Sequence, residues 1–349
     1  GTGSFLIAWY EVLSKYHSHE YVVNNMLWGF ETNFSYFKAN NKYYQFKNVY
    51  KESFLETDKL DNMKFDVVLG NPPYKAGMHL DFLNIGFNLL QDNGILSIIH
   101  PSQPFLNNKP TKKQKREIKV LETVNNNTST LELVNGNKLF DNINIYVPLS
   151  ITTIKKDGIK SNTLVSSNYL GFKSKESLEN IESLTIHGNS KLVNSIKSKI
   201  LKKSKSMVVE HLSPTKVDSK FYLNFNIIGG NIGLDWDLKD FYCPFYKAYE
   251  NDPDKHILDF PKNPNSIQFD SYQEALNFFN YMKSKFSRFC ISLCKINQNL
   301  HRGETSYLPY LDPSQEWDND KCFDYFKLNK KEREFIKTYI GDWYDIDFK

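Results

Sequence analysis

The sequence predicts an α/β protein with a doubly wound, mainly parallel sheet, followed by an α+β domain. Two observations support this prediction. Short apolar runs of strand length alternate with segments of helical periodicity over residues 1–156. From residue 157 the alternation stops, and helical segments and short aromatic runs follow in no regular order. We therefore expect two domains, residues 1–156 and residues 157–349.

The first elements follow from hydrophobic spacing. Apolar residues near the start recur at roughly helical intervals, namely Phe5, Ile7, Ala8, Val12 and Leu13. Residues 26–30 and 46–50 are short apolar runs that predict buried strands. Residues 65–69 predict a third strand, because Gly70 and two prolines end this apolar run.

The elements that follow are predicted in the same way. Leu80, Leu83, Phe87 and Leu90 predict a helix that ends at residues 92–94, Asp-Asn-Gly. Residues 95–99 predict a strand ended by Pro101, and residues 128–134 and 145–154 predict two late strands that pair. In the second domain, residues 191–205 and 272–300 predict helices, and residues 206–245 predict short strands.

Composition excludes several classes of protein. Apolar residues make up 40% and charged residues 24%, which is typical of a globular chain. No apolar run approaches the ~18 residues of a membrane span, and no signal peptide is present. The cysteines are Cys243, Cys290, Cys294 and Cys322. None of them forms a Cys-x-x-Cys pair, and the absence of a disulfide framework predicts a reducing cytoplasm. Cys290 and Cys294 would share one helix face, which predicts buried thiols; metal binding is the alternative, which no clustered histidines support.

The strongest chemical signal is Asn71-Pro72-Pro73-Tyr74, directly after the strand predicted over residues 65–69. In open α/β sheets, ligands bind beyond the carboxyl ends of the strands. Two prolines remove two backbone donors and hold the loop extended, so carbonyl oxygens stay free to accept. The Asn71 side-chain carbonyl and the face of Tyr74, rather than its hydroxyl, then suit a planar substrate with an NH2 group. The alternative is a rigid turn without chemistry.

These residues resemble a known family. Residues 65–74 are similar to the catalytic motif of N6-adenine DNA methyltransferases, and residues 1–6 resemble the latter half of their cofactor motif. Residues 29–31, 51–55 and 82–101 resemble further motifs in the order called gamma. The likeness covers residues 1–156 and is only general beyond them. It implies a Rossmann-like, S-adenosylmethionine-dependent methyltransferase with residues 157–349 as its target recognition domain.

The resemblance implies a role for each matching residue. The glycines at the start would let the backbone approach the methionine part of S-adenosylmethionine. Glu31 would accept from the ribose hydroxyls, and Phe82 would lie against the adenine. The implied cofactor-binding set is Gly1, Thr2, Gly3, Glu31, Ser53, Phe54, Asn71 and Phe82. The implied catalytic set is Asn71, Pro72, Pro73 and Tyr74, and Tyr74 and Phe140 would stack on the target adenine.

The chain departs from the family pattern in two places. The third motif usually has an aspartate before Phe-Leu, whereas this chain has Ser53 with Glu52 beside it. A serine hydroxyl can still accept a hydrogen bond, so weaker cofactor binding is expected. The first strand and the Asp-Pro start of the cofactor motif are absent before Gly1. We therefore expect further residues before Gly1 in the native protein, because a parallel sheet without its central strand would expose apolar edges.

Three segments concentrate positive charge in a chain whose net charge is only +4. They are residues 109–119, residues 191–205 and residues 283–302. Phosphate contacts of this kind give affinity for DNA without reading its sequence. The alternative for each segment is a solvated helix face. The residues predicted to contact the DNA backbone are Lys109, Lys112, Lys113, Lys115, Arg116, Lys199, Lys202 and Lys203.

These observations together predict a DNA methyltransferase that acts on N6 of an adenine flipped out of duplex DNA, as part of a restriction-modification or related system. Double-stranded DNA is the expected substrate, and a restriction-modification subunit or an upstream nuclease or helicase domain is the expected partner. A prokaryotic or phage origin is also expected. The alternatives are a non-catalytic DNA-binding or specificity subunit with a degenerate cofactor site, and a methyltransferase of RNA or of protein glutamine.

Overall fold

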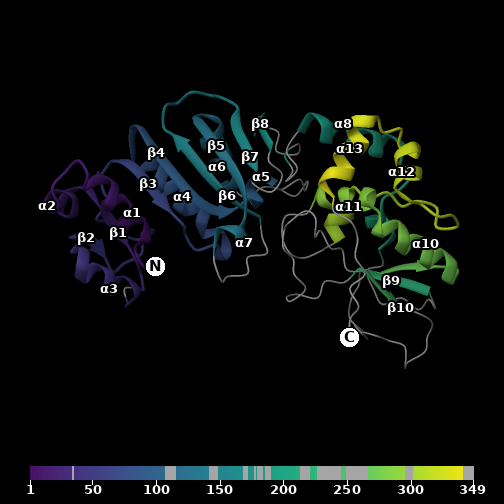
Figure 1. The fold of residues 1–349 in the computed structure, drawn as a ribbon, viewed down its shortest axis with the longest axis horizontal. Coiled ribbons are helices and arrows are strands. Elements are labelled where there is room, and N and C mark those ends of the chain that lie inside the picture. The colour runs from purple at the N-terminus through teal and green to yellow at the C-terminus, as the bar shows by residue number, and fades with distance from the viewer. Residues whose placement is uncertain are drawn as a thin grey trace. The chain divides into compact units, whose positions relative to one another are not determined.

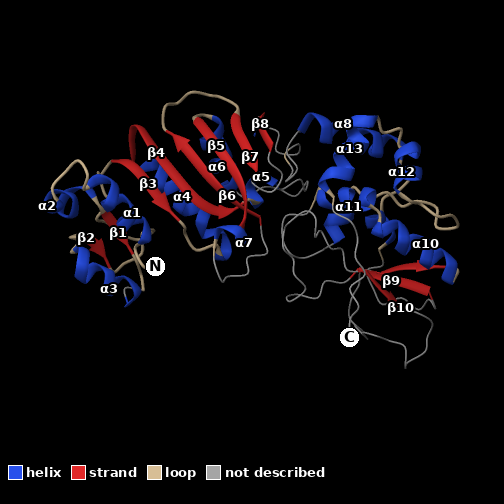
Figure 2. Cartoon of the chain, viewed as in Figure 1, coloured by secondary structure: helices blue, strands red, loops and turns tan. Residues whose placement is uncertain are grey.

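The fold is taken from a computed structural model of residues 1–349 (Figures 1 and 2). It describes residues 1–33, 35–106, 115–140, 148–167, 172–176, 178, 184, 190–212, 221–225, 245–248, 266–294 and 302–340. The chain divides into two compact units. Unit 1 holds residues 1–100, 114–128 and 152–160, and unit 2 holds residues 101–113, 129–151 and 161–349.

The start of unit 1 carries a small parallel sheet with helices around it. The elements in order are α1 (Ser4–Leu13), α2 (His19–Tyr21), the π-helical turn η1 (Val22–Met26), β1 (Trp28–Phe30), α3 (Ser35–Tyr44) and β2 (Asn48–Tyr50). β1 pairs with β2 in parallel register, Gly29 opposite Val49. The buried centre consists of Val22, Val23, Leu27, Phe37 and Phe46. The predicted helix and both predicted strands are confirmed, except that Met26 ends the π-helical turn and the strand starts at Trp28.

The next segment forms one edge of the larger sheet. β3 (Phe65–Gly70) is followed by η2 (Lys75–Gly77), α4 (Met78–Asn88) and β4 (Leu90–Pro101), and β3 pairs with β4 in parallel. Gly86 lets α4 approach the sheet closely, because an added Cβ would lie 2.9 Å from Leu96 and 3.3 Å from Val68. The carboxyl ends of β3 and β4 are therefore neighbours, with Gly70 opposite Ile98.

One boundary in this segment was predicted wrongly. The helix ends at Asn88, and Leu90 begins β4, so Asp92-Asn93-Gly94 lies inside a strand rather than at a helix end. Hydrogen bonds from Asn93 N to the Lys156 carbonyl and from Lys156 N to the Gly94 carbonyl continue the strand pairing here. The register between β3 and β4 shifts at Phe65–Val67, opposite these turn-forming residues. Asp92-Asn93-Gly94 therefore forms a β-bulge, in which residues typical of turns interrupt the regular pairing of the strands.

The larger sheet has six strands in the order β3-β4-β6-β5-β7-β8 (Figure 2). Its remaining elements are α5 (Gln103–Leu106), α6 (Lys115–Asn125), β5 (Thr128–Asn135), α7 (Gly136–Leu139), β6 (Pro148–Lys155), β7 (Thr163–Ser167) and β8 (Phe172–Glu176). β5 and β7 are parallel, whereas β7 and β8 are antiparallel. The predicted α/β fold and the predicted pairing of the two late strands are confirmed. The sheet is mixed rather than mainly parallel, because hydrogen bonds join the start of β4 to the end of β6 and Ser102 to Pro148, as in an antiparallel pair. The sheet continues past residue 156, and the division of function at that residue remains a prediction.

The rest of unit 2 is mainly helical. Its elements are α8 (Ser190–Lys203), α9 (Val208–His211), β9 (Phe221–Phe225), β10 (Phe245–Ala248), β11 (Ser266–Phe269), α10 (Tyr272–Lys283), α11 (Lys285–Ser292), η6 (Arg302–Thr305), α12 (Asn319–Tyr325) and α13 (Lys330–Tyr339). β9 lies between β10 and β11 in a three-stranded antiparallel sheet. The helix predicted over residues 191–205 is confirmed, and so is the described part of the helix predicted over residues 272–300, which Ser284 interrupts. Of the short strands predicted over residues 206–245, β9 lies in the described part, and the short helix α9 precedes it.

Cys290 and Cys294 are buried free thiols, as predicted. Cys322 is also a buried free thiol, and Cys243 lies outside the described residues. Burial raises the pKa of the Cys290 thiol well above its ordinary value, which keeps it protonated. Within the described ranges, no cluster of His, Cys, Asp and Glu side chains is arranged to hold a metal ion. Nor does any described helix have the length and apolarity needed to cross a membrane.

Candidate active site

The catalytic loop predicted from the sequence, residues 71–74, lies at the carboxyl end of β3. Asn71 and Pro73 are exposed, Pro72 is buried and Tyr74 is half-buried. The Tyr74 hydroxyl donates a hydrogen bond to Asn71 Oδ1 over 2.8 Å. Burial raises the pKa of Tyr74 to about 12, so the hydroxyl keeps the proton that it donates. The loop therefore presents an asparagine carbonyl whose orientation is held by a neighbouring phenol.

A cation from α6 holds the turn that follows this loop. Arg116 Nη1 forms an ion pair with Asp81 Oδ2 over 2.8 Å, and Arg116 Nη2 donates to the Ala76 carbonyl over 3.1 Å. Ala76 and Gly77 have φ values of 53° and 73°, so this turn is tight and needs the glycine. Both bonds direct Arg116 toward α4, and its contact with the DNA backbone remains a prediction.

The glycine segment and the acid predicted to bind the cofactor lie together. Gly1 lies beside the Glu31 carboxylate, since a Cβ added at Gly1 would lie 3.9 Å from Glu31 Oε2. The other Glu31 oxygen accepts from Asn33 N over 2.7 Å. Gly3 has a φ of 85°, and an added Cβ would lie 2.6 Å from the Phe37 ring, so no other residue fits there. Thr2 Oγ1 is 2.9 Å from Ser4 Oγ at the start of α1.

Aromatic rings connect Glu31 to the helix after the catalytic loop. Phe30, which precedes Glu31, contacts Phe54 at 6.0 Å between ring centroids. Phe54 stacks on Phe82 of α4 at 5.2 Å with an interplanar angle of 15°. Ser53 Oγ accepts from Leu55 N over 3.3 Å, and the neighbouring Glu52 forms an ion pair with Lys59 at 3.5 Å. Ring contacts thus connect Phe30, the neighbour of Glu31 in the chain, with Phe54 and Phe82.

This set of residues fits S-adenosylmethionine. A glycine backbone with no room for a Cβ allows close approach, and a carboxylate beside it can accept from ribose hydroxyls. The Phe54–Phe82 pair offers an apolar surface for a purine. Because the two rings already stack on each other, a bound purine would lie against an outer face of the pair. The assignment of these residues to a cofactor remains a prediction.

Phe140, the second predicted stacking residue, follows α7 and is half-buried. It belongs to unit 2, whereas Tyr74 belongs to unit 1. A stack of both rings on one adenine therefore remains a prediction.

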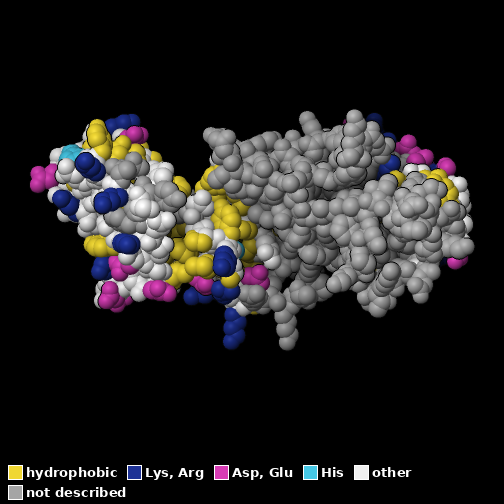
Figure 3. All heavy atoms as spheres, turned by 90° about the horizontal axis from the view of Figure 1, so that it is seen from below, with side chains coloured by type: hydrophobic (Ala, Val, Ile, Leu, Met, Phe, Trp, Pro, Cys, Tyr) yellow, Lys and Arg dark blue, Asp and Glu magenta, His cyan; other side chains and the backbone are white. Residues whose placement is uncertain are grey.

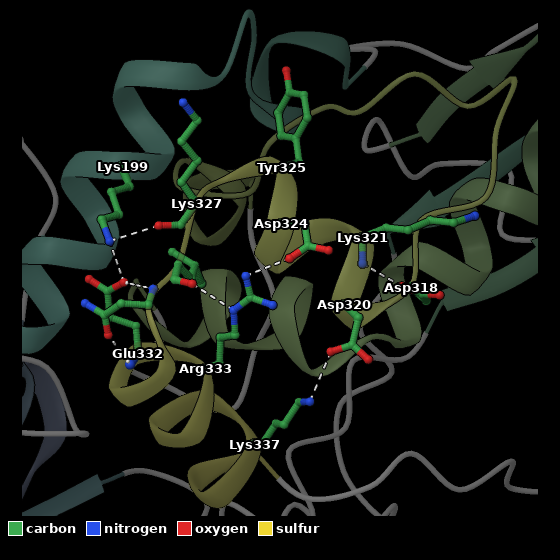
Figure 4. A network of polar contacts seen from close by, with 12 residues as sticks. Lys199, Asp318, Asp320, Lys321, Asp324, Tyr325, Lys327, Glu332, Arg333 and Lys337 are labelled. Atoms are coloured by element: carbon green, nitrogen blue, oxygen red, sulfur yellow. Dashed lines mark hydrogen bonds and ion pairs between the residues drawn. The ribbon is translucent and has the colours of Figure 1, made fainter.

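Two of the three predicted DNA-backbone lysines on α8 have partners inside unit 2, and Figure 4 shows those of Lys199. Lys199 Nζ lies 2.6 Å from Glu332 Oε2, a fully buried carboxylate, and donates to the Lys327 carbonyl over 3.1 Å. Lys203 Nζ donates to the Tyr325 carbonyl and lies 4.0 Å from the centroid of the Tyr325 ring. Both ammonium groups thus join α8 to the α12–α13 region. These internal contacts count against the prediction that Lys199 and Lys203 contact the DNA backbone.

The other basic residues differ in exposure. Lys115 and Lys202 are exposed, whereas Lys109, Lys112 and Lys113 lie outside the described residues. Arg288, in the third basic segment, is 2% exposed, and its Nε donates to the Lys283 carbonyl. On the face shown in Figure 3, the described basic side chains are scattered among acidic and hydrophobic ones. Lys115 and Lys202 are therefore the described residues that best fit the predicted phosphate contacts.

The reasoning from sequence missed two histidines beside the catalytic loop. His79 lies at the start of α4 and His100 near the end of β4, and both are buried. Their rings stack at 5.6 Å, and the edge-on contact of His79 with Tyr74 spans 6.4 Å. Their positions in the sequence could have pointed to them, because His79 closely follows Tyr74 and His100 lies near the end of the next strand.

Comparison with known proteins identifies the segment around this site. Residues 13–140 match the family model of the Eco57I restriction-modification methylase. Over this segment, which is less than half of the chain, the sequence is similar to that family. The match includes β1 with Glu31, the catalytic loop and Phe140, and it begins after the glycines at the start of the chain. No curated protein sequence matches the chain.

Solved structures are similar to parts of the chain. A protein from Vibrio vulnificus YJ016, described as a modification subunit of a type I restriction enzyme, has 15% identity and a TM-score of 0.39 over 56% of this chain and 46% of that one. The M protein of the type I enzyme EcoKI has 12% identity and a TM-score of 0.36 over 49% and 42%. A type I methyltransferase subunit from Streptococcus thermophilus has 20% identity and a TM-score of 0.31 over 50% and 42%. The chain spans less than half of each of these proteins.

Proposed function

We propose that this protein is an S-adenosylmethionine-dependent DNA methyltransferase that modifies N6 of adenine in duplex DNA within a restriction-modification system. The observation that carries the proposal is the Asn71-Pro72-Pro73-Tyr74 loop at the carboxyl end of β3, with the Asn71 carbonyl oriented by the Tyr74 hydroxyl. The similarity of residues 13–140 to the restriction-modification methylase family supports it. The adenine leaves the helix to reach this loop, because a stacked base cannot present its amine.

The residues of the loop act by orientation. Asn71 Oδ1 has two lone pairs, one of which accepts from the Tyr74 hydroxyl while the other is free for an N–H of the adenine amine. A backbone carbonyl of the proline segment accepts the second N–H, which turns the nitrogen lone pair toward the methyl donor. S-adenosylmethionine, when bound, supplies an electrophilic methyl group on a sulfonium. The ring of Tyr74 holds the base by stacking.

Methyl transfer to DNA tests the proposal. Duplex DNA is incubated with the protein and S-adenosylmethionine carrying a labelled methyl group, and its nucleosides are separated and identified. We expect label in N6-methyladenine and none in RNA or in glutamine peptides offered as alternatives. Asn71→Ala should lower the rate by ~10²-fold or more while DNA binding is retained, because Asn71 acts on the reacting amine. Label in another nucleoside or in a peptide, or a rate above a tenth of wild type in the variant, would refute the proposal.

A further inference from the structure

The buried histidine pair beside the catalytic loop has no role in the function proposed above. His79 is 6% exposed and His100 is 0% exposed. Their rings are nearly parallel, with an interplanar angle of 15°, and His100 Nε2 lies 2.8 Å from Thr152 Oγ1 on β6. The pair is thus anchored to the sheet from the His100 side, and His79 is its member nearest to the loop.

Contacts lead from this pair to the catalytic amide. The Tyr74 ring meets His79 edge-on, at 6.4 Å between centroids and an interplanar angle of 86°. The hydroxyl of the same ring donates to Asn71 Oδ1 over 2.8 Å. A change in the position of His79 therefore changes the direction of the Tyr74 hydroxyl and, through it, the orientation of the Asn71 amide.

The polar atoms of His79 are unusual for a buried side chain. Both ring nitrogens are buried, and neither makes a hydrogen bond of good geometry within the described residues. Leaving such groups unpaired costs stability, so a buried polar group without a partner calls for an explanation. The backbone carbonyl of Tyr74 acts on His79 as a hydrogen-bond acceptor, and this interaction raises the pKa of the imidazole.

The surroundings keep the imidazole neutral. Burial is the largest effect and lowers the pKa of His79 below 6.5, and Arg116 acts in the same direction, while the Tyr74 carbonyl and Asp81 oppose it. The groups that face His79 are Tyr74 from the loop, Asp81 from α4, His100 from β4 and Arg116 from α6. A proton gained as the pH falls would put a charge into this buried stack.

We propose that His79 is a positioning residue for methyl transfer, whose neutral ring holds Tyr74 and thereby the Asn71 amide in the orientation that accepts the target amine. The inference rests on the proposed function for its effect on the rate. His79 takes no part in bond making. Its ring lies edge-on to Tyr74 and stacks on His100, and an N–H of the neutral ring acts on the Tyr74 carbonyl.

Kinetics of two variants test this role. In His79→Gln and His79→Phe we expect kcat to fall about tenfold, the effect of one displaced hydrogen bond, with KM for DNA unchanged. The wild-type rate should fall as the pH drops below 6.5, and this acid limb should be absent in His79→Gln. His211→Gln is the matched control, since His211 also has a lowered pKa but lies in unit 2, and it should keep the rate and the acid limb. Wild-type kcat in His79→Phe, or an unchanged acid limb in His79→Gln, would overturn the proposal.

A second readout does not depend on catalysis. The side-chain amide signals of Asn71 in the full chain, assigned by their loss in Asn71→Ala, are followed by NMR against pH. We expect them to shift with the same midpoint as the His79 ring, and not to shift in His79→Gln. Amide signals that stay constant while His79 titrates would overturn the positioning role. If wild type transfers no methyl group, the proposed function fails, and this titration still decides the part played by His79.

Discussion

Replacing Lys199 with Met tests whether the basic face of α8 is built for DNA or for packing. Lys199 Nζ lies 2.6 Å from Glu332 Oε2, and the Glu332 side chain is 0% exposed. The same carboxylate accepts from Ser195 Oγ and from Asn329 N, each over 2.7 Å. The variant thus leaves a buried carboxylate with two of its three donors.

The expected loss of stability follows from these contacts. Removing one partner of a buried ion pair costs ~3–5 kcal/mol when the other charge is left alone. Here two donors remain and the Lys199 side chain is 32% exposed, so we expect about 2 kcal/mol, within the range for a hydrogen bond to a charged group. Lys202→Met is the matched control on the same helix, and its exposed side chain should change stability by no more than ~0.5 kcal/mol.

Urea unfolding of the full chain, followed by fluorescence at several pH values, measures both effects. Burial acts to raise the pKa of Glu332, but hydrogen bonds from Lys199, Ser195 and Asn329 outweigh it and lower the pKa below 4.5. A lowered pKa means stabilisation that is fully present above pH 4.5 and lost as the pH falls through the lower folded value. The difference in the free energy of unfolding between wild type and Lys199→Met should therefore be largest at pH 7 and should decrease below pH 4.5. Equal stability of the two lysine variants at pH 7 would refute the reasoning.

Three further predictions concern the site. Tyr74→Ala should weaken binding of the flipped base by ~1–3 kcal/mol, and equal base affinity in this variant and wild type would contradict the stacking role. Tyr74→Phe should bind the base as wild type does, but its kcat should fall about tenfold because the hydrogen bond to Asn71 is lost. Glu31→Gln should weaken S-adenosylmethionine binding about tenfold or more in calorimetry, while Glu20→Gln, an exposed acid of α2, should leave it unchanged. Lys202→Gln should lower the slope of log affinity for DNA against log salt by at most ~0.9, equally for every DNA sequence, and an unchanged slope would mean that this lysine contacts solvent alone.

The sequence by itself determined the central part of the site. An apolar run followed by Gly70, Asn71 and two prolines can only end a strand and continue as an extended loop, because these restrictions act within a few residues. Hydrophobic spacing predicted α1 and α4 and the strands around them for the same reason. The end of α4 was predicted wrongly, because Asp-Asn-Gly can occupy a bulge in a strand such as β4 as readily as the end of a helix.

Only the tertiary structure decided which groups meet across long stretches of chain. The lysine run on α8 predicted phosphate contacts, yet the partner of Lys199 lies 133 residues away on α13. Strand β7 joined the large sheet by pairing with β5, and β8 joined it by pairing with β7, which no local pattern encodes. The stack of His79 on His100 likewise depends on the packing of α4 over β4. Charge and periodicity are properties of neighbours in sequence, whereas the fold decides which partner a buried carboxylate, a strand edge or an imidazole meets.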